Sequence, residues 1–182
     1  MELVEDRQSI LDISETTTEQ AFQMFDGLEP VALDFMLGRW RGSEISTGHP
    51  MDGLLSASNW YGKEFIDAEH VHPLLFLASD GKITKVAPNP VAMEWMLRTP
   101  IFKNDALKPF LSLTTALLKT EDSQARLRMM EYRGKVSATM IYDYLPINDA
   151  FRKIDDNSVM GVMDYKILPQ PFFFVLKRDL TP

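Results

Sequence analysis

The second half of the chain is a succession of strand patterns separated by short turns, and this feature constrains the fold more than any other. Five strands are predicted at 125–132, 135–146, 150–155, 158–167 and 172–179. Arg133-Gly134 and Asp156-Asn157 mark two of the turns between them. Consecutive strands joined by such short turns pair as an antiparallel meander.

The strand that begins at Lys135 shows what kind of sheet this meander forms. Side chains alternate between the two faces of a strand, so one face carries Val136, Ala138, Met140 and Tyr142. The other face carries Ser137, Thr139, Ile141 and Asp143. Neither face is strongly charged, and this favours a barrel with a lined interior over a sandwich that has one wet face.

The first half adds further strands and a helix. Strand patterns are predicted at 38–45, 60–66, 71–78 and 82–87, which brings the total to the number that closes a small barrel around one ligand. Thr16 opens a helix whose apolar residues Ala21, Phe22, Phe25 and Leu28 recur at helical spacing. Residues 1–15 are expected to be weakly ordered, and 88–120 to form short helices or a lid.

We therefore predict a mainly β (α+β) protein: an antiparallel β-barrel of about 8–10 strands, with an N-terminal helix and short helices in the middle. The barrel is expected to form a single domain over 16–182. Its first part is expected at 22–80 and its C-terminal meander at 122–179.

Composition excludes several classes of protein. The chain of 182 residues has no cysteine, so disulfides, thiolate metal sites and a cysteine nucleophile are absent. The net charge is −7, and the densest basic cluster, Arg126, Arg128 and Arg133, is interrupted by Glu131, so we expect no nucleic-acid partner. No stretch approaches the roughly 18 apolar residues of a membrane span, and no signal peptide is visible. We expect a cytoplasmic protein.

Four short motifs resemble the bacterial GXWXG protein family. They are Gly38-Arg39-Trp40-Arg41-Gly42, Gly48-His49-Pro50, Trp60-Tyr61-Gly62-Lys63 and Val71-His72-Pro73-Leu74. The segments EYRGKVSATMIYDYLPINDAFRKID, VMGVMDYK and FFFVLKRD resemble the C-terminal domain of unknown function that accompanies this family. The two resemblances cover roughly residues 22–179 and imply a fold rather than an activity.

A more distant likeness connects the Gly-x-Trp strand to lipocalins and the haem-binding nitrobindins, and so implies a calycin-like barrel. The chain departs from the nitrobindin pattern at Ser43-Glu44-Ile45, which weakens a haem assignment. In such a barrel Trp40 is expected to plug one end, with a partner for its indole N–H. Gly38 and Gly42 are expected to allow a close backbone approach or a bulge.

Polar residues that would act inside the barrel form two groups. Asp164 shares a strand face with Met160 and Val162, so we expect a desolvated carboxylate with a raised pKa, or alternatively a carboxylate that ends the strand in solvent. Arg152 is expected to pair with Asp149 or Asp164 and to orient a ligand.

The three histidines form the other group. His70 and His72 point to the same face if both lie on one strand, and the loop that holds His49 could fold over them. No carboxylate stands at a signature spacing, so a metal or haem site at these histidines is the weakest of the alternatives. His72 is also a candidate acid–base group.

The sequence supports two functions of different classes. The first is a protein that binds a small hydrophobic or amphipathic molecule inside the barrel, without a cofactor. Its cavity is expected to be lined by Trp40, Trp60, Tyr61, Met140, Tyr142, Arg152 and Phe174. The second is a cofactor-free acid–base enzyme of the isomerase, dehydratase or cyclase type, with Asp164 or His72 as the catalytic group. A homodimer through an edge of the meander also stays open.

Overall fold

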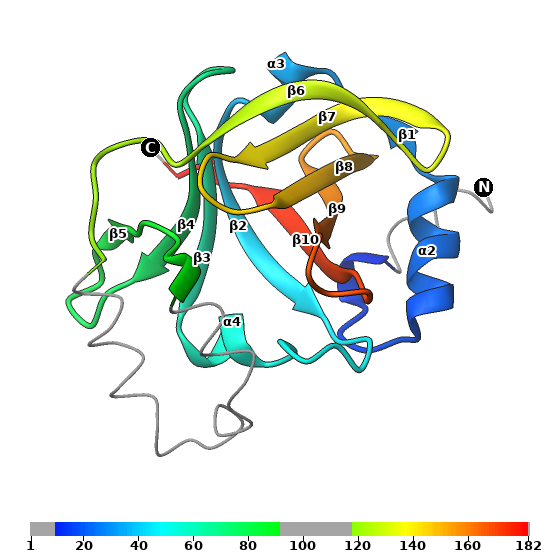
Figure 1. The fold of residues 1–182 in the computed structure, drawn as a ribbon, viewed down its shortest axis with the longest axis horizontal. Helices are drawn as coiled ribbons and strands as arrows, with labels where there is room; N and C mark the ends of the chain where they lie inside the picture. Colours follow the sequence, from blue (N-terminus) through cyan, green and yellow to red (C-terminus); the bar gives the residue numbers. More distant parts are fainter. Residues whose placement is uncertain (1–9, 92–117, 182) are drawn as a thin grey trace.

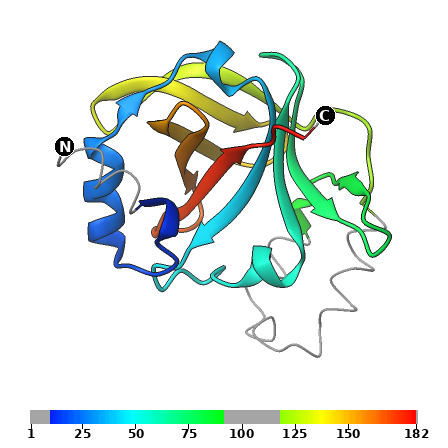
Figure 2. The same ribbon diagram turned by 180° about the vertical axis from the view of Figure 1, so that it is seen from behind.

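A computed structural model describes residues 10–91 and 118–181, and in it eight strands close into an antiparallel barrel (Figure 1). The strands of the ring are β2 (Gly38–Ile45), β3 (Trp60–Phe65), β4 (Val71–Leu77), β6 (Ala125–Tyr132), β7 (Lys135–Tyr142), β8 (Ile147–Asp155), β9 (Ser158–Tyr165) and β10 (Phe172–Arg178). They follow one another around the ring in this order, and β10 returns to β2 (Figure 2). The predicted antiparallel barrel is confirmed.

Two short strands lie outside the ring. β1 (Glu29–Pro30) pairs with β8, and β5 (Ile83–Lys85) pairs with β4. Strands β6 to β10 are the meander that the sequence predicts. Its first hairpin turns at Arg133 and Gly134, which have φ angles of 51° and 75°. Two successive residues at positive φ give the tight turn whose twist matches that of the flanking strands.

The seam between β4 and β6 is where the two halves of the chain meet along one side of the barrel. A single residue pair, Val71 with Ala125, joins these two strands in register. Two backbone hydrogen bonds flank this pair, from Gln124 to Val71 and from Leu127 to Ala68. The segment 88–120, predicted to form short helices or a lid, falls largely outside the described residues.

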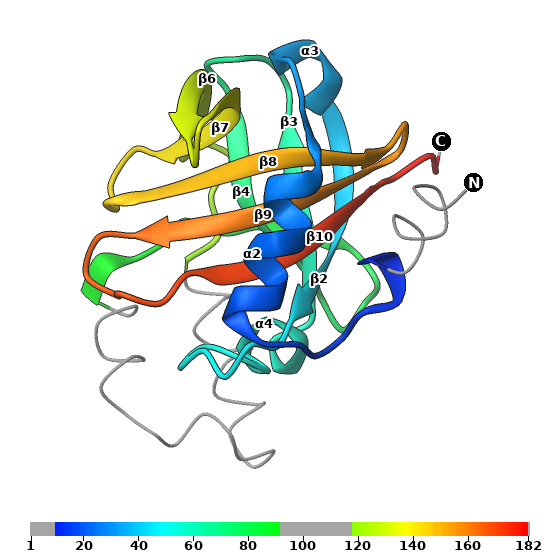
Figure 3. The same ribbon diagram turned by 90° about the vertical axis from the view of Figure 1, so that its right-hand side faces the viewer.

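Helix α2 (Thr18–Gly27) lies across the outer face of β8, β9 and β10 (Figure 3). Thr17 caps it in a capping box with Gln20. Its buried residues Ala21 and Phe25 belong to a core on that outer face, which also contains Ile45, Ala150, Ile154, Met160, Val162, Phe173 and Val175. Residues 10–15 also pack here: Ile10 is buried, and Glu15 pairs with Ser46.

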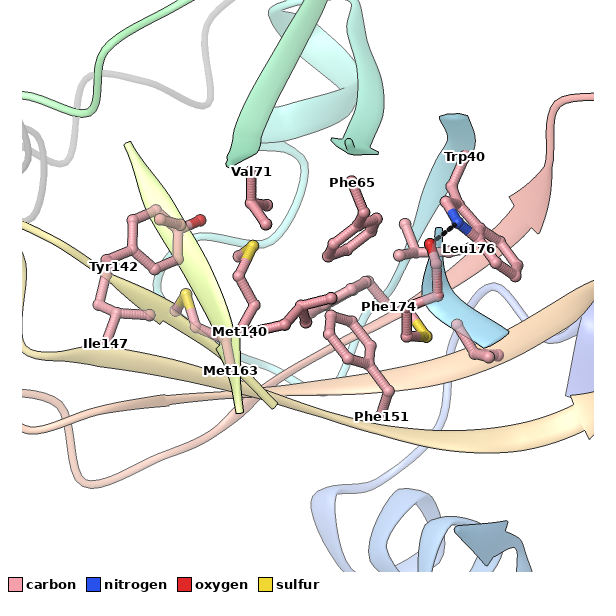
Figure 4. Close-up of a cluster of buried hydrophobic side chains, with 14 of the residues drawn as sticks. Trp40, Phe65, Val71, Met140, Tyr142, Ile147, Phe151, Met163, Phe174 and Leu176 are labelled. Carbon is pink, nitrogen blue, oxygen red and sulfur yellow. Dashed lines mark hydrogen bonds between the residues drawn. The ribbon is translucent and has the colours of Figure 1, made fainter. Parts of the chain in front are cut away.

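A second core lies in the barrel interior (Figure 4). It contains Trp40, Phe65, Val71, Met140, Tyr142, Ile147, Phe151, Met163, Phe174 and Leu176, among others. Two short helices add to this core: α3 (Leu33–Met36), before β2, contributes Met36, and α4 (Leu54–Ala57), before β3, contributes Leu54. Because β8, β9 and β10 have a core on each face, most of their residues are buried, and the sequences of β9 and β10 are largely apolar.

The glycines of the Gly-x-Trp-x-Gly motif have separate structural reasons. Gly38 has φ of 107°, which favours glycine. A Cβ at Gly42 would lie 2.1 Å from a ring carbon of Trp60, so only glycine leaves room for that ring. The bulge expected at these glycines lies instead on the neighbouring strand. Gly62 has φ of 146°, and a Cβ there would meet the carbonyl oxygen of Trp40 at 1.9 Å.

No helix within residues 10–91 and 118–181 is long and apolar enough to cross a membrane.

Candidate functional site

A buried ion pair lies inside the barrel. Lys63 Nζ is 2.9 Å from Asp149 Oδ2, and the two side chains are 4% and 1% exposed. Lys63 Nζ also donates a hydrogen bond to the carbonyl of Pro73 at 3.2 Å. Asp149 stands between Ile147 and Phe151, which are interior residues on the same face of β8. Two opposite charges therefore share an otherwise apolar space.

Three aromatic rings surround the ammonium group of Lys63. Its Nζ lies 5.0 Å from the ring centroid of Phe174, 5.7 Å from that of Trp60 and 5.8 Å from that of Tyr142. Trp60 and Phe174 meet edge to face, with centroids 6.0 Å apart. Aromatic faces are electron-rich and stabilise a nearby cation, so these rings are favourable neighbours for the ammonium group of Lys63.

Burial dominates the electrostatics of the pair. Desolvation raises the pKa of Asp149 above its ordinary value, and the charge and hydrogen bond of Lys63 oppose this shift. The pKa of Tyr142 lies well above its ordinary value, because the phenol is buried and the Asp149 charge disfavours a phenolate beside it. Burial therefore shifts the pKa of both groups towards their neutral forms, and Lys63 opposes this shift at Asp149.

Several buried polar atoms of this interior have no hydrogen-bond partner in the described part of the chain. Asp149 Oδ1 and Trp60 Nε1 are two of them. Each is a strong hydrogen-bonding group, and native proteins rarely leave such groups buried and unpaired. A carboxylate oxygen is an acceptor and an indole N–H is a donor, so the site offers one unused group of each kind.

His49 and Glu44 add two more such atoms, His49 from the loop between β2 and β3 and Glu44 from β2 itself. His49 is buried, packs edge to face on Phe172, and accepts a hydrogen bond from the Met51 N–H at its Nδ1. Its Nε2 is buried, and burial lowers its pKa, whereas the charge of Asp52 and the backbone of Gln170 oppose this shift. Glu44 accepts hydrogen bonds from Ser56 at Oε1, while its Oε2 is buried and unpartnered there.

Four of the residues predicted to line a cavity lie around this pair. Met140, Tyr142 and Phe174 belong to the interior core, and Trp60 packs against it. The ring of Phe174 lies over Gly161, where a Cβ would be 2.3 Å from a ring carbon. Glycines thus make room on the barrel wall for both aromatic rings, Trp60 over Gly42 and Phe174 over Gly161.

Trp40 and Tyr61 are placed differently. Trp40 is fully buried at the end of the interior opposite Tyr142 (Figure 4), and its indole Nε1 donates a hydrogen bond to the carbonyl of Met36 at 2.7 Å. Its polar atom is therefore already used. Tyr61 donates a hydrogen bond to Asp179 and accepts one from Arg41, in a cluster near the C-terminus.

The side chain of Arg152 does not point into the barrel. It is buried under α2, where its guanidinium donates to the carbonyls of Tyr132 and Lys135 at 2.7 and 3.2 Å and lies 4.9 Å from the Phe25 ring centroid. The expected pairing of Arg152 with Asp149 is wrong, because neighbouring residues of a strand point to opposite faces and Asp149 is an odd number of positions away.

Asp164 is exposed. It does share the face of Met160 and Val162, as predicted, but this is the outer face. The expectation of a desolvated carboxylate at Asp164 is therefore wrong, and the alternative of a carboxylate in solvent holds.

The histidines do not form a cluster. His70 is exposed and contacts Asp67, whereas His72 is buried, with an unpartnered Nδ1 and a pKa lowered by desolvation. The charges that act on His72 are those of Lys85, Glu64 and Glu121 rather than those of the interior pair. Among the described residues no group of three or more His, Cys, Asp or Glu side chains is arranged to hold a metal ion.

Lys63 is the residue that sequence reasoning missed. One signal points to it: Lys63 stands two residues before the interior Phe65, so the two side chains share a strand face. Asp149 was recognised as polar, but with the wrong partner. The two-residue step from Ile147 through Asp149 to Phe151 would have placed its carboxylate in the interior.

Comparisons with known proteins agree with this architecture. Residues 23–81 match the family model described as GXWXG protein, and residues 123–178 match a domain of unknown function, DUF4334. A protein from Thermomonospora curvata with a known crystal structure is 34% identical to this chain in sequence, and the two structures superimpose with a TM-score of 0.73. The match covers 98% of this chain and 99% of that one. None of the curated proteins matches the chain.

Proposed function

The chain belongs to the GXWXG protein family and carries its companion domain of unknown function, and we propose that it binds a small hydrophobic or amphipathic molecule inside the barrel. The observation that carries this proposal is the buried pair of Lys63 and Asp149, with the unpartnered Asp149 Oδ1 and Trp60 Nε1 beside it. A bound molecule would supply the missing hydrogen bonds.

The proposed contacts separate into two kinds. Met140, Tyr142 and Phe174 provide apolar surface, and methionine adapts to ligands of different shapes. Asp149 and Trp60 provide the polar contacts. Eight strands enclose an interior of a size that side chains fill or that holds one small ligand, which sets the scale of the molecule.

Binding of an apolar fluorescent probe, such as N-phenyl-1-naphthylamine, tests the proposal. Met140→Trp adds bulk at an interior position that is fully buried, whereas Met129→Trp makes the same change at a position that is 44% exposed. We expect the interior variant to weaken probe binding at least tenfold and the exposed variant to leave it unchanged. Thermal melting of both variants establishes that each is folded. Equal binding by the two folded variants would contradict an interior site.

A second candidate function rests on Asp149. Burial raises its pKa, and its free oxygen Oδ1 stands in the proposed binding site, as a general acid or base requires. The acid–base role predicted for Asp164 or His72 would then fall to Asp149. Its test is the incorporation of deuterium from D2O into a bound molecule. Deuterium exchange that Asp149→Asn abolishes would support catalysis. If the native protein catalyses no exchange, ligand binding without catalysis is the function that stands.

A further inference from the structure

The charges of the interior restrict the polar group that a ligand carries there. Lys63 and Asp149 cancel each other, so the pair offers no net charge to a ligand. Lys63 Nζ already has the Asp149 oxygen Oδ2, the Pro73 carbonyl and the face of Phe174 as partners. The lysine is therefore satisfied, and the part of the pair left for a ligand is the second carboxylate oxygen of Asp149.

We infer that the ligand is a neutral apolar molecule with a hydroxyl group, and that this hydroxyl donates its hydrogen bond to Asp149 Oδ1. The inference rests on the proposed ligand-binding function and specifies its chemistry. A hydroxyl is a donor and an acceptor at once. Its hydrogen satisfies the unused carboxylate oxygen of Asp149, and its oxygen can accept a further hydrogen bond.

An anionic ligand does not fit these groups. A carboxylate has only acceptor oxygens, and it would face Asp149 Oδ1 without a proton to share. On β2, Glu44 Oε2 is a second buried carboxylate oxygen without a partner among the described residues. Like charges brought together in a buried space cost free energy, so a fatty-acid-like anion is disfavoured.

A cationic ligand is disfavoured for the complementary reason. An ammonium group at Asp149 Oδ1 would stand beside the ammonium of Lys63, which holds the other oxygen of the same carboxylate. The aromatic rings that would stabilise a ligand cation already surround Lys63. Because Lys63 already occupies both the aromatic rings and one oxygen of the Asp149 carboxylate, a neutral hydrogen-bond donor fits Asp149 Oδ1 best.

The test uses four compounds with one apolar body: 1-octanol, octanoate, octylammonium and octyl methyl ether. Each displaces N-phenyl-1-naphthylamine from the full chain at pH 7. We expect 1-octanol to bind about tenfold more tightly than each of the other three compounds, because only 1-octanol is a neutral molecule that donates a hydrogen bond to the charged Asp149. The ether is the most informative comparison, because it keeps the oxygen and the apolar body but has a methyl group in place of the donated hydrogen.

A double variant tests whether the preference for 1-octanol depends on the buried ion pair. Lys63→Met with Asp149→Leu removes both charges at once, and we expect the four compounds to bind it within about twofold of one another. The matched control is Lys82→Met with Asp80→Leu, since those residues form an ion pair on the surface. This control is expected to keep the preference for the alcohol.

The possible failures are distinguishable. Absence of probe binding to the native protein would overturn the proposed function and this inference together. Probe binding with octanoate, octylammonium or the ether as tight as the alcohol would overturn the inference and leave the proposed function intact.

Discussion

Lys63 and Asp149 meet inside the barrel at 2.9 Å, although they belong to different halves of the chain. Lys63 lies within residues 23–81, which match the GXWXG family model, and Asp149 lies within 123–178, which match the companion domain. The two matched segments therefore form one closed barrel with a shared interior, and the ion pair is a contact that neither segment makes alone.

Removal of one member of this pair is expected to destabilise the protein strongly. Lys63→Met leaves the buried Asp149 carboxylate without its cation, a change that costs about 3–5 kcal/mol in comparable pairs. The additional change Asp149→Leu removes that charge as well and is expected to restore most of the free energy of unfolding. Urea denaturation of the single and double variants measures both. A single variant within about 1 kcal/mol of the native protein would contradict the prediction.

Asp179 is expected to make stability depend on acid pH. Thr181 and Tyr61 donate hydrogen bonds to its carboxylate and lower its pKa from 3.8 to about 2. A carboxyl group whose pKa is lower in the folded state stabilises that state above its unfolded pKa, and this contribution is lost as pH falls through the folded value. The window here runs from about pH 4 down to about pH 2.

Asp179→Asn tests this dependence. The variant should be less stable than the native protein at neutral pH, and the difference in free energy of unfolding should shrink as pH falls through that window. Denaturant titrations at several pH values measure it. A difference that is the same at pH 7 and at the acid end would show that the ionised carboxylate is not what stabilises the fold.

Gly42→Ala is expected to destabilise the barrel wall. The added Cβ would overlap the ring of Trp60, which lies between Gly42 and the interior and cannot move without disturbing Phe174. Overpacking of this kind costs about 1–3 kcal/mol. Gly27→Ala is the matched control, because nothing lies within 4 Å of a Cβ there. Thermal melting should separate the two variants, and equal melting temperatures would refute the packing argument.

Arg152→Met is expected to affect stability but not binding. The guanidinium satisfies the carbonyls of Tyr132 and Lys135 beneath α2, and each carbonyl left unpaired costs about 1–3 kcal/mol. The side chain lies outside the barrel, so the affinity for an apolar probe should stay within about twofold of the native value. A folded variant with a much weaker affinity would place Arg152 back in the binding site.

The sequence predicts the fold well because the strands and turns of the barrel depend on short-range sequence patterns. The alternation from Ala125 onward and the turn residues Arg133 and Gly134 depend only on neighbours in the chain, and the structure confirms the strands they predict. The capped helix near Thr17 is equally local. The bulge at Gly62 was not predicted, because it depends on the backbone of the adjacent strand rather than on its own sequence.

The candidate site is harder to predict. Alternation along a strand shows which residues share a face, but it does not show whether that face lies inside the barrel or under another element. The alternation places Asp164 with Met160 and Val162, but only the packing of α2 shows that this face is the outer one. The same helix buries Arg152 away from the interior. Lys63 and Asp149 were not connected, since pairing across the barrel depends on closure of the ring by strands far apart in sequence.

Native mass spectrometry of the protein purified without added ligand shows whether the barrel holds a small molecule. We expect a discrete small apolar molecule that is bound to the native chain, is released on denaturation, and is reduced or absent in Met140→Trp but retained in Met129→Trp. A native protein that carries no such molecule and also fails to bind an apolar fluorescent probe would refute ligand binding inside the barrel.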